Sequence, residues 1–396
     1  MLSIAADGSY AARLVRAPGT AGDAWYAERW TLDGPEPYAV PLPAGQPEEP
    51  DSPVQPLADG RVLIARYADG RYHLALLYPS GPETGELPLG ALESPVPLRL
   101  LPPAPDGARV YALVPDDAAG ETAVWLVCGG AFGPELVTRV PGHCAGGAWL
   151  DAGGRLLALD RTDPATGHTR TVTVDVEAGG PPSELLRITE HSNDRLLMAD
   201  TDSGLLLVVS DAPGEDRLGW GVLGSRLPVR FPEALHPDGV MIKPFAVQPG
   251  QMLTPEACAV ALWLSAPEVG AGWVAVWRAQ QREVQPIAAP EGWLAGVGRW
   301  TAGGELLLPY ATEELPWGLA RVAVPVPEPQ PLRPAPEAAL PVDGADAGGA
   351  GGGDGGPAGP VTGPGAMPPA APSPAPSPPA VTKPVPLHHS PLARTD

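Results

Sequence analysis

Histidine, cysteine and carboxylate side chains that stand close together in the sequence are the first candidates for chemistry. His143 and Cys144 form the only adjacent histidine–cysteine pair, within VPGHCAGGAW. A nucleophilic cysteine needs a nearby base that removes its proton. Neighbouring residues of an extended strand point to opposite faces of a sheet. We therefore expect a turn histidine beside a buried thiol at this position, and no catalytic pair.

Two acidic segments are candidates for cation binding. Asp200, Asp202 and Gly204, in MADTDSGLL, are similar to the first half of a calcium loop, where oxygen ligands alternate along the chain. The apolar run that follows supplies no further carboxylates, which favours an ordinary polar turn. The segment DRTDPATGHTR, which begins at Asp160, also contains a histidine, and we interpret it as a solvent-exposed hairpin tip.

The remaining polar residues indicate no further site. His388 and His389 lie in a Pro-rich stretch near the C-terminus and could bind a metal only weakly. Seven histidines and three cysteines (Cys128, Cys144 and Cys258) provide no convincing set of metal ligands, and three cysteines are too few for a disulfide framework. We assign no catalytic, cofactor-binding or metal-binding residue and no cofactor from the sequence.

Tryptophan is the one residue type whose distribution indicates a binding surface. Flat aromatic rings on an exposed rim can hold sugars or peptides. The alternative is that these rings pack between sheets, which we favour because stacked sheets need large apolar residues. Six of the eleven tryptophans fall late in the chain: Trp263, Trp273, Trp277, Trp293, Trp300 and Trp317.

The charge balance excludes several classes of partner. The chain has 396 residues, 46 of them acidic and 25 basic, and a formal charge of −21. Such acidity opposes binding to phosphate backbones and to anionic lipid, so we expect neither a nucleic-acid nor a membrane partner. No apolar run is long enough to span a membrane. The start, MLSIAADGSYAARLVR, lacks the pattern of a secretory signal, so a cytoplasmic location is expected.

A repeated unit organises the first 326 residues. PPAPDGARVYALVPDDAAGETAVWLVCGG, residues 102–130, contains an Asp-Gly turn, an apolar strand, a polar turn and a second apolar strand. The first strands of similar units align at Arg61, Arg109, Arg155 and Arg195, with further copies at Ser9, Gly239 and Glu305. The long interval 239–305 contains two apolar runs, which we interpret as an inserted hairpin or as a differently counted blade.

A period of 40–50 residues with several strands in each copy is typical of a β-propeller. We predict an all-β fold with seven blades over residues 1–326, while six or eight blades remain possible. The repeats resemble those of TolB-like propellers and of the N-terminal propeller domains of prolyl-oligopeptidase-like proteins, in which a Pro-Asp-Gly turn precedes a strand. Those oligopeptidases carry a hydrolase domain, but this chain has no Gly-x-Ser-x-Gly motif. The resemblance therefore does not imply peptidase activity.

Residues 327–396 differ sharply from the rest, being rich in proline, glycine and alanine and nearly free of large apolar residues. This composition predicts a disordered tail, in which Pro-x-x-P segments could dock into an aromatic groove. For the whole chain we expect a non-catalytic propeller that binds a protein partner through one rim. The alternatives are a metal-assisted enzyme of the lyase or lactonase type at the mouth of the channel, and a propeller that binds sugars or small molecules through the late tryptophans.

Overall fold

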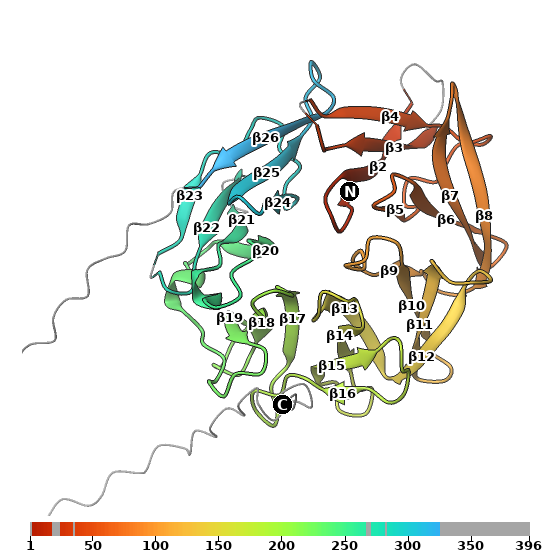
Figure 1. Cartoon of the computed structure of the whole chain (residues 1–396). Helices are drawn as coiled ribbons and strands as arrows, with labels where there is room; N and C mark the ends of the chain where they lie inside the picture. The colour runs from red at the N-terminus through yellow and green to blue at the C-terminus, as the bar shows by residue number, and fades with distance from the viewer. Residues whose placement is uncertain (1, 18–23, 35, 267–270, 282, 325–396) are drawn as a thin grey trace, which may run out of the picture. The chain divides into compact units, whose positions relative to one another are not determined.

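The computed structural model describes residues 2–17, 24–34, 36–266, 271–281 and 283–324. These residues form seven antiparallel sheets, with two single-turn 3-10 helices, η1 (Glu233–Leu235) and η2 (Pro255–Ala257), and no α-helix. No helix within the described chain is long and apolar enough to cross a membrane. The sheets stand around a common axis (Figure 1). The predicted all-β propeller with seven blades is confirmed.

Each blade is a meander of consecutive strands, the first nearest the axis and the last at the periphery (Figure 1). Blade 1 contains β1 (Ser3–Ile4), β2 (Tyr10–Arg16), β3 (Trp25–Thr31) and β4 (Tyr38–Leu42). Blade 2 contains β5 (Val54–Pro56), β6 (Val62–Ala68), β7 (Arg71–Ser80) and β8 (Glu83–Glu93). Blade 3 contains β9 (Arg99–Leu100), β10 (Val110–Asp116), β11 (Glu121–Cys128) and β12 (Glu135–Pro141). Blade 4 contains β13 (His143–Trp149), β14 (Leu156–Thr162), β15 (Thr169–Asp175) and β16 (Ser183–Glu184).

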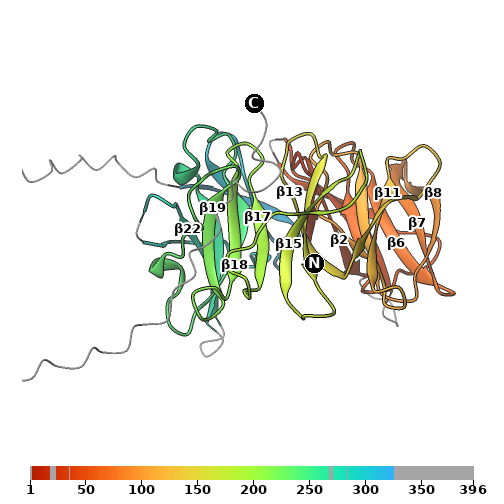
Figure 2. The same cartoon turned by 90° about the horizontal axis from the view of Figure 1, so that it is seen from below.

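The remaining blades complete the ring. Blade 5 contains β17 (Asp194–Ala199), β18 (Leu205–Ser210) and β19 (Arg217–Val222). Blade 6 contains β20 (Met241–Val247), β21 (Val260–Ala266), β22 (Ala271–Trp277) and β23 (Gln285–Ile287). Blade 7 contains β24 (Arg299–Trp300), β25 (Glu305–Tyr310) and β26 (Gly318–Ala323). Seen from the side, the strands run roughly along the axis of the ring (Figure 2).

The second strand of each blade carries the sequence repeat. These strands begin at residues 10, 62, 110, 156, 205, 260 and 305, at steps of 45 to 55 residues. The predicted starts at Ser9, Arg61, Arg109, Arg155 and Glu305 fall at or directly before second strands. The period is therefore more even than the spacing of the predicted starts.

Two of the predicted starts are wrong by one strand. Arg195 lies in β17 and Gly239 precedes β20, and both are first strands. The hairpin predicted within 239–305 is wrong as well, because its two apolar runs are β21 and β22, successive strands of blade 6. Length contributes to this error, because β17 and β20 have 6 and 7 residues and can imitate the repeat, whereas β1, β9 and β24 have 2 each. The first strand β13 also has 7 residues, but the Gly146-Gly147 bulge interrupts its apolar pattern.

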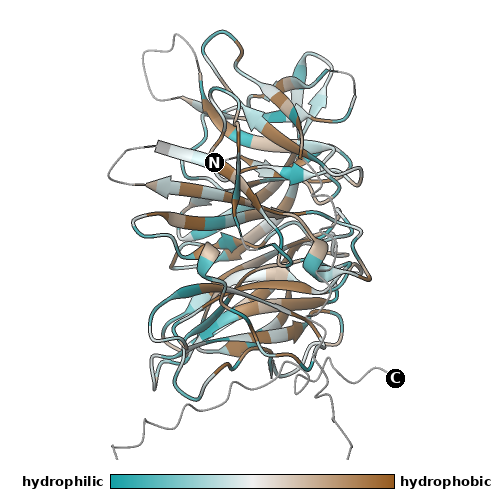
Figure 3. Cartoon of the chain, turned by 90° about the vertical axis from the view of Figure 1, so that its left-hand side faces the viewer, coloured by the Kyte–Doolittle hydropathy of each residue, from teal (hydrophilic) through white to brown (hydrophobic). Residues whose placement is uncertain are grey.

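Packing between blades follows the two-residue period of a strand. In β6, Val62 and Ile64 pack with the apolar side chains of blade 1, while Leu63 and Ala65 pack with those of blade 3. Each sheet thus buries both faces, because neighbouring residues project to opposite sides. Apolar residues accordingly lie along the stacked strands and hydrophilic residues in many of the turns (Figure 3). Each of the seven interfaces between blades has its own apolar cluster.

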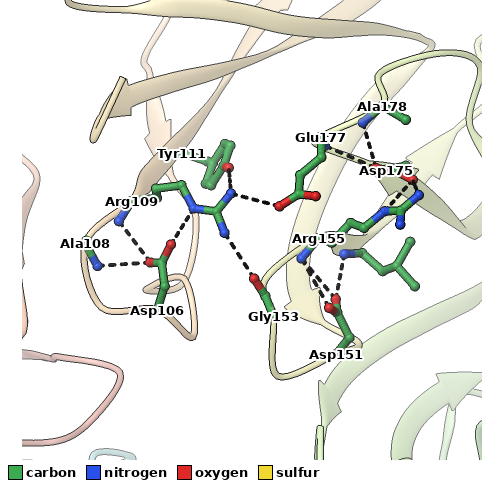
Figure 4. A network of polar contacts seen from close by, with 11 residues as sticks. Asp106, Ala108, Arg109, Tyr111, Asp151, Gly153, Arg155, Asp175, Glu177 and Ala178 are labelled. Carbon is green, nitrogen blue, oxygen red and sulfur yellow. Dashed lines mark hydrogen bonds and ion pairs between the residues drawn. The ribbon is translucent and has the colours of Figure 1, made fainter. Parts of the chain in front are cut away.

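The Asp-Gly turn before a second strand fixes neighbouring blades to each other. In blade 3, Asp106 Oδ1 accepts hydrogen bonds of 3.0 Å from the backbone N–H groups of Ala108 and Arg109 (Figure 4). Gly107 has a φ of +69°, in the left-handed region that favours glycine. The Ala58 N–H of the equivalent turn in blade 2 donates to the Gly107 carbonyl at 2.9 Å.

Arginine side chains repeat this connection elsewhere in the ring. Arg109 Nη2 donates to the Gly153 carbonyl of blade 4 at 3.0 Å (Figure 4). Arg29 Nη1 of blade 1 donates to the Gly60 carbonyl of blade 2 at 3.1 Å. The repeated turn is therefore both a local reversal of the chain and a contact between blades.

The ring closes between blades 7 and 1 without a shared sheet. Each sheet consists of strands that are consecutive in the chain, so the two terminal blades meet through side chains. Trp30, which is fully buried, packs at this seam with Ala11 and with partly buried Trp317 of blade 7. Arg299 donates to the Asp7 carbonyl across the seam, and Arg13 Nη2 donates to the Pro316 carbonyl at 2.9 Å. The predicted tail, residues 327–396, and with it His388 and His389, lies outside the described residues.

Candidate functional site

His143 and Cys144 are not brought together. His143 begins β13, is exposed, and places Nδ1 3.7 Å from Asp117 Oδ1. Cys144 projects to the other face and packs against the apolar cluster between blades 3 and 4. Burial raises the pKa of the Cys144 thiol to about 11, so the thiol is protonated at neutral pH. The pair therefore lacks the geometry and the ionisation of a nucleophile with its base.

The two aspartates of MADTDSGLL have separate structural partners. Asp200 Oδ2 accepts hydrogen bonds from Ser203 N–H at 2.9 Å and from Ser203 Oγ at 2.5 Å, in the turn between β17 and β18. Asp202 Oδ2 accepts the Gly250 N–H of blade 6 at 2.8 Å. In the described part of the chain, no group of three or more histidine, cysteine, aspartate or glutamate side chains could hold a metal ion.

The six late tryptophans are buried or partly buried rather than exposed at the surface. Trp277 and Trp300 are buried, and the other four rings are partly buried, with none of the six exposed. Five of them belong to, or pack against, the clusters between blades, namely Trp273, Trp277, Trp293, Trp300 and Trp317. Their position agrees with the packing alternative, and they offer no exposed aromatic platform for a sugar.

The prediction that the segment beginning at Asp160 is an exposed hairpin tip is wrong for Asp160 itself. It lies within β14 and is only 6% exposed. Asp160 Oδ1 accepts hydrogen bonds from Thr171 Oγ1 at 2.8 Å and from the Leu196 N–H of blade 5 at 2.9 Å. The strands of this hairpin extend to Thr162 and Thr169, so only the residues between them form the turn. Pairing of β14 with β15 buries the carboxylate, although the polar composition of the segment predicted an exposed turn.

Asp160 borders a cavity of about 710 Å³ on the axial side of blades 1 to 5. A volume of this size lies within the range of small-molecule sites, about 300–1,000 Å³. We call it the axial cavity and define it by its polar and glycine lining, Ser3, Asp51, Ser52, Gln55, Arg99, Gly146, Gly147 and Asp160, with leucine, valine and proline side chains between them. Its acidic residues are Asp51 and Asp160, and none of the described residues that line it is a histidine. The converging ligand set required for a metal-assisted reaction is not formed by these residues.

A bulge in β13 opens space beside Asp160. The pairing of β13 with β14 shifts between Ala145 and Ala148, and the intervening Gly146 and Gly147 have φ values of +71° and +128°. A Cβ at Gly146 would lie 2.7 Å from Asp160 Oδ2. Glycine inside a strand often marks a bulge or a close approach of the backbone. The Gly-Gly of HCAGGAW is thus the sequence signal that could have located this site, although the sequence-based predictions did not include it.

The electrostatic state of Asp160 reflects its burial. Desolvation raises the pKa of Asp160, and this effect outweighs its hydrogen bonds to Leu196 and Thr171 and the charges of Arg195 and Arg99, which lower it. A buried carboxylate whose charge is not fully compensated favours a cationic or hydrogen-bonding partner.

A second depression lies on the surface of blades 5 and 6. It has a volume of about 260 Å³ and is lined by Trp220, Leu227, Pro228, Arg230, Leu253, Pro255 and Glu256 among others. We call it the rim groove. Trp220 and Arg230 exchange two backbone hydrogen bonds of 2.9 Å. They place residue 230 beside β19, where blades 1 to 4 and 6 have a fourth strand. The Arg230 guanidinium stacks 5.1 Å from the Trp220 ring centroid.

Comparison with known proteins identifies the fold and nothing finer. No model of a protein family and no curated protein sequence matches the chain. A solved puromycin hydrolase is similar over 81% of this chain and 51% of its own, with 17% identity and a TM-score of 0.52. The chain thus spans about half the length of that hydrolase.

Two further solved structures are propellers of the predicted types. The β-propeller domain of the Trilobed protease from Pyrococcus furiosus, described as having an open velcro topology, is 10% identical over 80% of this chain and 90% of its own, with a TM-score of 0.50. TolB from Acinetobacter baumannii is 11% identical over 79% of each chain, with a TM-score of 0.42. The predicted resemblance to the propeller domains of peptidases is confirmed by the Trilobed protease domain, and at such identity it concerns the fold alone.

Proposed function

We propose that this propeller is a non-catalytic binding protein that holds a protein partner at the rim groove. The observation that carries the proposal is a group of exposed apolar side chains around the stacked Arg230 and Trp220. Leu253 is 95% exposed and Leu227 is 53% exposed, and both border the groove. Met252, next to Leu253 in the chain, is exposed as well. Contiguous exposed apolar residues with a polar rim are typical of protein-binding surfaces.

The size of the groove favours a protein over a small ligand. At about 260 Å³ it falls below the range of small-molecule sites, about 300–1,000 Å³. Such a depression suits one or two side chains inserted from a partner, as in the central anchor of a protein interface. Arg230, which lines the groove and is exposed, belongs to a residue type that is common in such anchors, and the buried Trp220 supports it from below.

Charge supports a basic partner. The chain has a formal charge of −21, while the groove itself contains one acidic residue, Glu256, and one basic residue, Arg230. Complementary charges around an apolar anchor accelerate association and select between partners. We therefore expect a partner that presents an apolar or aromatic side chain flanked by lysine or arginine.

Affinity capture from the native cell with quantitative comparison of variants tests this proposal. Leu253→Asp and Leu227→Ser change exposed groove residues, and Phe132→Asp is the matched control because Phe132 is 99% exposed in the β11–β12 connection of blade 3. We expect one protein to be recovered by the original chain and by Phe132→Asp, and to be lost with both groove variants. Recovery that is equal for all four chains, or no recovered partner, would refute the proposal.

A further inference from the structure

Three charged residues, Asp51, Arg99 and Asp160, line the axial cavity, and two of them, Arg99 and Asp160, carry opposite charges without forming an ion pair with each other. Arg99 projects from the short first strand of blade 3 and is exposed, whereas Asp160 is buried in blade 4. Within the described residues no ion pair joins them, although the charge of Arg99 is close enough to lower the pKa of Asp160. Two such groups facing one space attract a ligand that carries the complementary charges.

The hydrogen-bonding capacity of the cavity is also incomplete. Asp160 uses Oδ1 for Thr171 and Leu196, while Oδ2 faces the space left open by Gly146 and has no hydrogen bond within the described chain. Gln55, which is 3% exposed and lines the cavity, has an Nε2 group without a partner among the described residues. The Gln55 Nε2 atom is itself enclosed by protein, so the group that faces the cavity with unused hydrogen-bonding capacity is Asp160 Oδ2.

Most of the rest of the wall is apolar and comes from blades 1, 2, 3 and 5. Leu14, Val54, Leu98, Leu100, Leu196 and Leu197 are among the lining side chains. These surfaces suit an apolar side chain of the ligand rather than a sugar, which would need many more hydrogen-bonding groups.

We propose that the axial cavity binds a small zwitterion with an apolar side chain, the chemistry of a free amino acid or of a short peptide with both ends free. The ligand ammonium contacts Asp160 Oδ2 beside Gly146, and the ligand carboxylate contacts the exposed Arg99 guanidinium. A simple amine would leave Arg99 without a partner, and a simple carboxylate would leave Asp160 Oδ2 without a hydrogen-bond donor. This site is separate from the rim groove and does not depend on the function proposed there.

Isothermal titration calorimetry of the full chain tests the ligand chemistry. The probes are L-leucine and L-leucyl-L-leucine, with N-acetyl-L-leucine lacking the ammonium and L-leucinamide lacking the carboxylate. We expect at least one zwitterion to bind, and removal of either charge to weaken binding about tenfold or more. The stronger of the two zwitterions identifies the source as an amino acid or a peptide.

Three variants locate the site. Asp160→Asn keeps an oxygen for Thr171 and Leu196 but removes the charge that faces the cavity, and Gly146→Ala places a methyl group 2.7 Å from Asp160 Oδ2. Asp163→Asn, in the turn of the same hairpin, is the control. We expect about tenfold weaker binding or more for the first two, and wild-type binding for the control. Thermal unfolding of Asp160→Asn should match that of the wild type, which separates lost binding from lost folding.

Three results would overturn the inference. One is that neither zwitterion binds at millimolar concentration. Another is that the acetylated compound or the amide binds as tightly as the zwitterion. The third is that Asp160→Asn, folded as the wild type, binds with unchanged affinity.

Discussion

The close contact between turns of neighbouring blades gives the sharpest test of how this ring is held together. Gly107 has a φ of +69°, and a Cβ added there would lie 2.5 Å from the Cβ of Ala58 in the preceding blade. Ala58 cannot move away easily, because its N–H donates to the Gly107 carbonyl at 2.9 Å. We therefore expect Gly107→Ala to destabilise the protein through two effects at once.

The two effects have different magnitudes and can be separated. A left-handed conformation costs a non-glycine residue about 1–2 kcal/mol. Overpacking of one methyl group against a fixed neighbour costs about 1–3 kcal/mol. Gly120 of the same blade has a φ of +66° but nothing within 4 Å of an added Cβ, so Gly120→Ala experiences only the first effect. Both changes restrict the unfolded chain equally, so their difference reports the contact between blades.

Equilibrium urea denaturation of the two variants measures this difference. We expect Gly107→Ala to lower the free energy of unfolding by about 1–3 kcal/mol more than Gly120→Ala does. Equal losses for the two variants would show that the turn contact does not hold the blades together, and would refute the role given to the repeated Asp-Gly turn.

Three further predictions concern the seam, a thiol and a carboxylate. Trp30→Ala should lower the free energy of unfolding by about 3–5 kcal/mol, because the fully buried ring fills the seam between blades 7 and 1; a loss in urea denaturation no larger than that of Tyr38→Ala, which truncates an exposed ring, would contradict this. Burial raises the pKa of the Cys144 thiol to about 11. At pH 8, about three units below that pKa, the thiol should resist a thiol reagent until denaturant is added. Rapid labelling of the folded protein would count against its burial. The hydrogen bonds of Arg155 and of the backbone N–H groups of Ala178 and Glu177 hold the pKa of Asp175 at about 2 (Figure 4). The contribution of Asp175 to stability is therefore present above the ordinary aspartate pKa and is lost as the pH falls toward the lowered value. An NMR titration should show this low pKa, and an unchanged pKa in Arg155→Met would exclude Arg155 as its main cause.

The sequence determined the class of fold because its signals are local. An apolar run such as VLIARY in β6, bounded by Asp-Gly turns, specifies a strand wherever it stands, and seven such units at a nearly even spacing specify a ring. Residues Val62 to Ala65, buried on both faces, already carry the alternation that lets one blade pack against two neighbours.

The tertiary structure alone decided which strand of a blade each repeat represents, and which polar residues are buried. First strands of two residues, such as β9 and β24, have too few positions to show a period, whereas the longer β17 and β20 resemble second strands. The starts predicted at Arg195 and Gly239 therefore lie one strand too early in the chain. The sequence around Asp160 predicts an exposed turn, but cross-strand pairing and the hydrogen bond from the Leu196 N–H of the next blade bury this residue. Gln55, Arg99 and Asp160 are far apart in the chain, and they line the same cavity only because their three blades surround one axis. Strand formation depends on neighbours in sequence, whereas a cavity between blades depends on how the whole ring closes.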